Sequence, residues 1–140
     1  MKIKNTSKIY DNELVRKVID FVRPPNVRNF DVMLKNSQYG IRGRCYTQGC
    51  AYHSTASPFI VACISPRVKY PYKFIGGKGY ISHTVYNSTE GLVSLLAHEL
   101  RHLWQAKVKK GWRVWGAKGQ FSERDADAYA IHKVREWRRI

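Results

Sequence analysis

The feature that most limits how this 140-residue chain can fold is a pair of histidines, His98 and His102, inside a long apolar stretch. Residues four apart lie on one face of an α-helix, with Cβ atoms about 6 Å apart, so these two imidazoles can bind one metal ion. Glu99 follows the first histidine, and its carboxylate can reach a water molecule on the ion without being a ligand. The apolar residues that precede the motif predict a largely buried helix over about residues 89–108.

A second segment favours a metal site over an amphipathic helix with two surface histidines. A catalytic zinc needs a third protein ligand, and the stretch from Ser122 onward predicts another helix over about 123–139, capped by Ser122. Glu123 and Asp127 lie on one face of this helix. Glu123 can therefore complete a His₂Glu site, and Asp127 can orient a ligand imidazole through its other nitrogen. Two small residues nearby would let the two helices approach closely: Ala126 and Ala130.

These two segments, Leu96–His102 and Glu123-x-x-Ala126-Asp127, resemble the gluzincin clan of zinc peptidases, which includes thermolysin. The short format is similar to the minimal gluzincins and the ImmA/IrrE-like peptidases, whose second motif has the same form. The resemblance implies a zincin-like domain with one zinc ion on His98, His102 and Glu123, and with Glu99 as general base. It also implies that residues 79–85 form the edge strand that binds an extended peptide by adding it to the sheet.

Thermolysin-like enzymes also use tyrosine and histidine side chains to stabilise charge on the substrate oxygen, and no spacing argument selects their equivalents here. The candidates are His83, Tyr86 and Tyr129, with Tyr80 and His53 as further options. Asp125, two residues from Glu123, is expected to point away from the metal and to be solvated. His132 is expected at the surface.

The remaining patterns predict one α+β domain over residues 1–140. Apolar residues at helical spacing predict a helix over 11–22. Short strands are expected at 30–34, 58–64 and 80–86, the second of them buried on both faces. Residues 38–57 lack a clear period and are interpreted as a loop or irregular hairpin. The expected architecture is an N-terminal helix, a short and mostly antiparallel sheet with an edge strand, an active-site helix and a C-terminal ligand-bearing helix.

The charge balance, 25 Lys and Arg against 10 Asp and Glu, gives a net charge of +15. Such a surface favours polyanionic partners, nucleic acid among them, although it can also serve solubility alone. Between the two metal-site helices, basic residues alternate with tryptophans, which suits phosphate contacts combined with base stacking. The alternative is that the tryptophans pack the connection, and this is favoured for Trp104. The candidate nucleic-acid contacts are Lys107, Lys109, Lys110 and Arg113.

The three cysteines favour reduced thiols, because their number is odd and no export signal precedes them. Cys45, Cys50, His53 and Cys63 could instead bind a second, structural zinc ion, but a Cys-x2-Cys step is absent. The first residues lack the apolar segment of a secretory signal, and no apolar run approaches the length of a membrane span. We therefore expect a cytoplasmic protein without a transmembrane segment.

Three functions are compatible with these patterns. The first is a zinc-dependent endopeptidase acting on a protein or peptide substrate. The second is a basic nucleic-acid-binding module whose metal is structural or vestigial, and the third is a peptidase-like regulator that cleaves a single partner protein. The intact Glu99 argues against the second, because a structural metal site has no use for an acid beside its first ligand.

Overall fold

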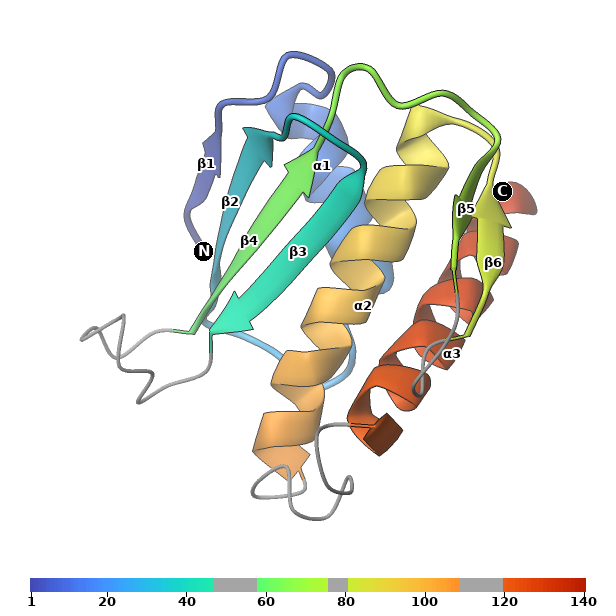
Figure 1. Cartoon of the computed structure of the whole chain (residues 1–140). Coiled ribbons are helices and arrows are strands. Elements are labelled where there is room, and N and C mark those ends of the chain that lie inside the picture. Colours follow the sequence, from blue (N-terminus) through green and yellow to red (C-terminus); the bar gives the residue numbers. More distant parts are fainter. Residues whose placement is uncertain (47–57, 76–80, 109–119) are drawn as a thin grey trace.

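The computed structural model of the chain describes residues 1–46, 58–75, 81–108 and 120–140 (Figure 1). It confirms the predicted α+β class and contains the three predicted helices. In chain order its elements are β1 (Ile3–Asn5), α1 (Asn12–Val22), β2 (Asp31–Asn36), β3 (Ile41–Tyr46), β4 (Phe59–Ile64), β5 (Tyr72–Phe74), β6 (His83–Val85), α2 (Ser88–Val108) and α3 (Gln120–Arg138).

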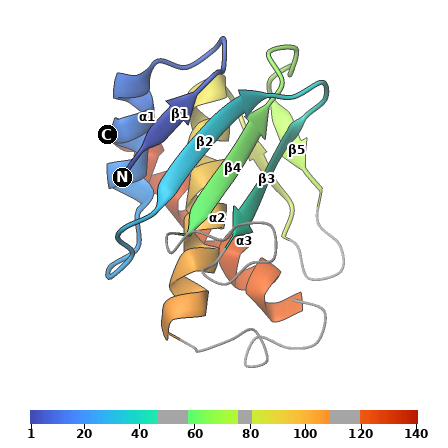
Figure 2. The same ribbon diagram turned by 90° about the vertical axis from the view of Figure 1, so that its left-hand side faces the viewer.

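The described strands form a four-stranded sheet, in the order β1-β2-β4-β3, and a separate two-stranded sheet of β5 and β6. In the larger sheet β1, β2 and β4 are parallel and only β3 is antiparallel to its neighbour, so the prediction of a mostly antiparallel sheet is wrong for this sheet. The physical reason is the connections: α1 crosses over between β1 and β2, and β3 carries the chain back between β2 and β4. The helices lie on one face, and Figure 2 shows the opposite face.

Strand β3 lies inside residues 38–57, which the sequence pattern assigns to a loop or irregular hairpin. Its sequence, Ile-Arg-Gly-Arg-Cys-Tyr, contains a glycine and only one β-branched residue, so the local signal for a strand is weak. Pairing along its whole length with β4 decides its conformation. The three-residue strands β1 and β5 are likewise not predicted, and the strand expected at 80–86 is confirmed only for His83–Val85.

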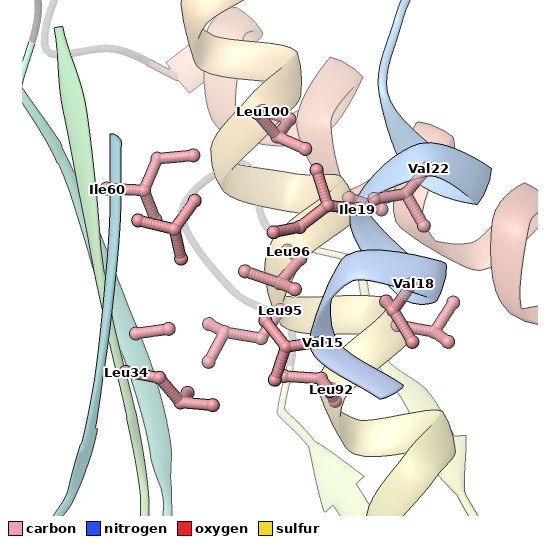
Figure 3. Packing of buried hydrophobic residues seen from close by; sticks show 14 of the residues in the cluster. Val15, Val18, Ile19, Val22, Leu34, Ile60, Leu92, Leu95, Leu96 and Leu100 are labelled. Atoms are coloured by element: carbon pink, nitrogen blue, oxygen red, sulfur yellow. The ribbon is translucent and has the colours of Figure 1, made fainter. Parts of the chain in front are cut away.

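The core lies between the larger sheet and helices α1 and α2 (Figure 3). Each large aliphatic side chain that is fully buried here contributes roughly 1.5–3 kcal/mol to stability. Its central members are Val15, Val18, Ile19 and Val22 of α1, Leu92, Leu96 and Leu100 of α2, and Leu34 and Ile60 of the sheet. Strand β4 is buried on this side only: Ile60, Ala62 and Ile64 are fully buried, whereas Phe59, Val61 and Cys63 on the other face are half-buried. The expectation that it is buried on both faces is therefore wrong for the described residues.

The helix starts show which capping predictions hold. Asp11 Oδ1 accepts a hydrogen bond from the Leu14 amide at 2.7 Å, and Asn87 Oδ1 accepts one from the Glu90 amide at 2.9 Å. Ser122, predicted to cap the last helix, instead lies inside α3 and is buried. In the part of the chain that the structure describes, no helix combines the length and apolarity needed to cross a membrane.

Glu90 ties the start of α2 to the end of α3, and it gives a first prediction. Its buried Oε1 accepts hydrogen bonds from the Tyr86 amide at 3.0 Å and from Arg138 at 2.7 Å. Burial opposes ionisation, but these donors outweigh it and hold the pKa of Glu90 below its ordinary value. We expect Glu90→Gln to lower the free energy of unfolding by about 2 kcal/mol at pH 7, as measured by urea titration of the chelator-treated protein.

The sign of the pH dependence follows from that lowered pKa. The contribution of Glu90 is present above its unfolded-state pKa, about 4.3, and is lost as the pH falls through the lower folded-state pKa. The difference between wild type and variant should therefore shrink below about pH 4. Glu136→Gln is the matched control: its side chain is half-exposed on α3 and pairs with His132 and Lys133 at the surface, so it should cost at most about 0.5 kcal/mol. An equal difference at pH 7 and pH 3.5 would contradict the role given to the Glu90 charge.

Candidate metal centre

Three side chains from two helices converge at one point. His98 and His102 of α2 face each other with their Nε2 atoms 3.1 Å apart. Glu123 of α3 places Oε2 3.0 Å from His98 Nε2 and Oε1 3.3 Å from His102 Nε2. Within the described residues these three form the group able to hold a metal ion. The packing of α3 on α2 that brings them together uses Ala126 and Ala130, both fully buried, as the sequence predicts.

Each imidazole is oriented through its other nitrogen. His98 Nδ1 lies 2.8 Å from Asp127 Oδ1, the contact expected of a residue that orients a ligand imidazole. The other oxygen of Asp127 accepts a hydrogen bond from the Ile81 amide at 2.8 Å, which fixes the carboxylate. His102 Nδ1 lies 2.9 Å from Gln105 Oε1, an acceptor that sequence reasoning did not identify. Both Nδ1 atoms therefore donate to oxygens, and both Nε2 atoms face Glu123.

This arrangement calls for positive charge at its centre. Glu123 Oε2 is buried and accepts no well-aligned hydrogen bond, although His98 Nε2 lies close to it. Burial alone would disfavour a charged imidazole, but the carboxylates of Asp127 and Glu123 raise the pKa of His98 to about 10. Burial would raise the pKa of Glu123, but the imidazoles of His102 and His98 outweigh it and lower that pKa. Two imidazole nitrogens and one carboxylate form the donor set of a divalent cation, which would take the place of the proton that the raised pKa of His98 favours.

Glu99 lies beside these three groups without joining them. Its Oε1 is 3.8 Å from His98 Nε2, and the side chain is buried. Burial raises the pKa of Glu99 above its ordinary value. Strand β3 passes directly over it: a Cβ added at Gly43 would lie 2.9 Å from both Glu99 Cγ and Leu95 Cδ1. A side chain at this strand position would displace the carboxylate, so the glycine allows the close approach.

A cleft of about 1410 Å³ opens over these residues. Strand β3 lines one side, and β5 with Ile81 and His83 lines the other, while α2 passes between them (Figure 1). His98, Glu99, His102 and Glu123 all line this cleft. Its volume exceeds the roughly 300–1000 Å³ typical of small-molecule pockets.

Of the three candidate oxyanion stabilisers, the structure places one in the cleft. His83 lines it, stacked on Phe74, with Nε2 2.8 Å from Ser94 Oγ and Nδ1 3.3 Å from the Ile81 carbonyl. Burial lowers its pKa, which favours a neutral ring. Tyr86 is exposed beneath Arg138, and the Tyr129 hydroxyl donates to the Val22 carbonyl, so neither lines the cleft. Tyr80 and His53 lie outside the described residues.

Asp125 is not the solvated acid that the sequence suggests. It accepts hydrogen bonds from Arg101 Nε at 2.8 Å and from Gln105 Nε2 at 3.0 Å. Gln105 also donates to the Ser122 carbonyl at 2.9 Å, so Asp125 and the α3 backbone together hold the amide that orients His102. Gln105 lies three residues after His102, on the same face of α2, and this spacing is the sequence signal that could have identified it. The exposed position of His132 agrees with the prediction.

The structure describes only part of the remaining candidate sites. Lys107 Nζ donates to the Asn26 carbonyl, while Lys109, Lys110, Arg113, Cys50 and His53 lie outside the described residues. The predicted packing role of Trp104 is confirmed, since the ring lies against the core. Cys45 shares the inner face of β3 with Gly43, whereas Cys63 points to the outer face of β4. These two cysteines cannot share one ion, because they lie on opposite faces of the sheet.

Comparison with known proteins adds no assignment: no family model, no curated protein and no solved structure matches this chain.

Proposed function

We propose that the protein is a zinc-dependent peptidase of the gluzincin type, with His98, His102 and Glu123 as metal ligands and Glu99 as general base. The observation that carries this proposal is the spacing of the three donor groups, 3.0, 3.1 and 3.3 Å from one another. A tetrahedral ion with bonds of about 2.1 Å separates its ligand atoms by about 3.4 Å, so the donors need little movement to accept zinc. The same donor set also accepts cobalt, manganese or iron.

The chemistry divides between the ion and the chain. A zinc ion in this site supplies Lewis-acid polarisation of the scissile carbonyl and acidifies a water molecule. Glu99 takes up the proton of the attacking water and passes it to the leaving amine. The buried surroundings suit this role, because they raise the proton affinity of the Glu99 carboxylate. Asp127 and Gln105 keep the ligand imidazoles in the tautomer that leaves Nε2 free for the ion.

Among the described strands, β3 is an edge strand of its sheet, and this supports an extended peptide as substrate. β3 is the last strand of its sheet, and it borders the cleft beside Glu99, whereas β6 belongs to the separate two-stranded sheet. The Gly40 carbonyl accepts from the Ser65 amide. Alternation along the strand then directs the main-chain groups of Ile41, Gly43 and Cys45 away from β4, toward the cleft. A substrate strand paired there lies next to the general base. We therefore assign the substrate-binding edge to β3 instead of residues 79–85.

Gln105 gives a prediction within this proposal. Gln105→Ala removes the acceptor of His102 Nδ1, so the imidazole loses the contact that fixes its orientation. We expect zinc affinity to fall by about 10- to 100-fold, measured by competition with a chromophoric chelator. Gln38→Ala, at an exposed glutamine remote from the cleft, should match wild type. Unchanged affinity in Gln105→Ala would remove this positioning role.

The direct test of the metal site is the zinc content of purified wild type, Glu123→Ala and Glu136→Ala. We expect one zinc per chain in the wild type and in Glu136→Ala, whose carboxylate sits elsewhere on the same helix. Glu123→Ala should lose most of its zinc after dialysis, because only two of the three protein ligands, the imidazoles of His98 and His102, remain. Equal zinc in all three proteins, or none in the wild type, would contradict the His₂Glu assignment.

A further inference from the structure

The outer face of the four-stranded sheet has an unusual composition for a surface without a covering layer. No described helix lies over it, as Figure 2 shows. A sheet with one solvated face normally alternates apolar residues toward the core with polar residues toward water. Here the central strand β4 instead presents apolar side chains on both sides, and those on the outer face are half-buried: Phe59, Val61 and Cys63.

The strand register turns these side chains into an ordered surface. One cross-strand row runs Lys4, Met33, Val61, Arg44, and the next runs Lys35, Cys63, Arg42. A third row places Phe59 beside Tyr46, whose rings stack with centroids 4.5 Å apart. Apolar side chains therefore occupy the middle of the face, and cations stand at both ends of two rows. At the usual strand spacing, Lys4 and Arg44 are separated by about 14 Å.

The charges on this face are unbalanced. Lys4, Lys35, Arg42 and Arg44 are all exposed, and within the described residues no ion pair involves any of them. The one carboxylate that the four strands present here is Asp31, which accepts a hydrogen bond from the Lys2 amide at 2.9 Å. This surface has cations on two sides of an apolar and aromatic strip. It is complementary to a flexible polyanion whose backbone carries negative charges and whose flat apolar side groups can lie on the strip.

We propose that this outer sheet face binds single-stranded nucleic acid, with bases on the apolar strip of β4 and beside Tyr46, and with phosphates on Lys4, Lys35, Arg42 and Arg44. A duplex is a poorer fit, because its bases are stacked on each other and cannot use the strip. A membrane is also a poorer fit, since the apolar side chains here are half-buried and the exposed large apolar residues of the described chain lie elsewhere. The proposal does not rest on the zinc ligands, which lie on the helix side of the sheet, although the edge-strand residues Arg42, Arg44 and Tyr46 also border the metal-site cleft.

The test is fluorescence anisotropy of labelled dT15 and rU15 at several salt concentrations, with wild type, Arg42→Ser/Arg44→Ser and Phe59→Leu. Arg16→Ser/Arg135→Ser is the matched control: it removes the same charge from exposed positions of α1 and α3. We expect the Arg42/Arg44 variant to bind about tenfold more weakly and to reduce the slope of log affinity against log salt by about 1.4. Phe59→Leu should weaken binding about fivefold or more without changing the slope. Circular dichroism checks that each variant is folded.

Each outcome decides the proposal. The proposal is supported if wild type and the α1/α3 control bind equally well, the Arg42/Arg44 variant binds about tenfold more weakly, and zinc-loaded and chelated protein do not differ. The proposal is overturned if neither oligonucleotide binds to wild type at 50 mM salt. It is also overturned if the Arg16/Arg135 control loses as much affinity as the Arg42/Arg44 variant, because binding then depends on net charge alone. Binding to vesicles of anionic phospholipid with the same dependence on Arg42 and Arg44, but not to the oligonucleotides, assigns the face to membranes instead.

Discussion

Glu99→Gln should abolish peptide hydrolysis while leaving zinc in place. The substitution keeps the size of the side chain but removes its ability to take a proton from water. General base catalysis contributes about 10²- to 10⁴-fold, so we expect a rate about 10³-fold below wild type. The carboxylate oxygen nearest the imidazoles lies 3.8 Å from His98 Nε2, outside the donor set formed with Glu123. The metal should therefore remain bound.

The assay uses zinc-loaded protein and a mixture of unstructured peptides, with products identified by mass spectrometry and zinc measured on the same samples. Glu136→Gln is the matched control, because it makes the same chemical change at a half-exposed site of α3 outside the cleft. Equal cleavage by wild type and Glu99→Gln would show that the activity comes from a contaminant or from a different group. No cleavage of any peptide by zinc-loaded wild type would contradict a general peptidase, even if the metal site is confirmed.

Removing zinc should lower the thermal stability of the protein. The ligands come from α2 and α3, so an ion that binds all three adds a further link between two helices that already pack through Ala126 and Ala130. At a free zinc concentration 100 times the dissociation constant, binding stabilises the folded state by about 2.7 kcal/mol. For a chain of this length that corresponds to an increase in Tm of about 5–10 °C, measured by differential scanning calorimetry with zinc or with chelator.

Glu123→Ala distinguishes this effect from a general action of the chelator. With the third ligand removed, the Tm of the variant should respond little to zinc or chelator. The substitution also removes the carboxylate that stabilises the charged form of His98, so it changes the stability of the metal-free protein. The Tm of the variant with zinc is therefore compared with the Tm of the same variant without zinc. A wild type whose Tm is the same with and without zinc would contradict the linkage between metal binding and the packing of α3 on α2.

The sequence by itself determined the elements that bear the site. Helical periodicity is a local property, so the spacing of His98 and His102 places them on one face of α2 regardless of the rest of the fold. The same holds for Glu123 and Asp127 on α3, and for the apolar stripe of α1. Small residues at Ala126 and Ala130 mark the side on which α3 is packed. These local rules predict the His/His/Glu group, which the structure brings together.

Only the tertiary structure decided the rest. β3 has a weak local signal, and its pairing with β4 places a glycine against Glu99 and a free edge along the cleft. In the sequence alone, Gln105 and Asp125 resemble other polar residues. The packing of α3 on α2 brings them together, so that Asp125 holds Gln105 and Gln105 orients His102. Contacts between residues far apart in sequence, such as strand pairing and helix packing, depend on the whole chain, and local periodicity does not encode them.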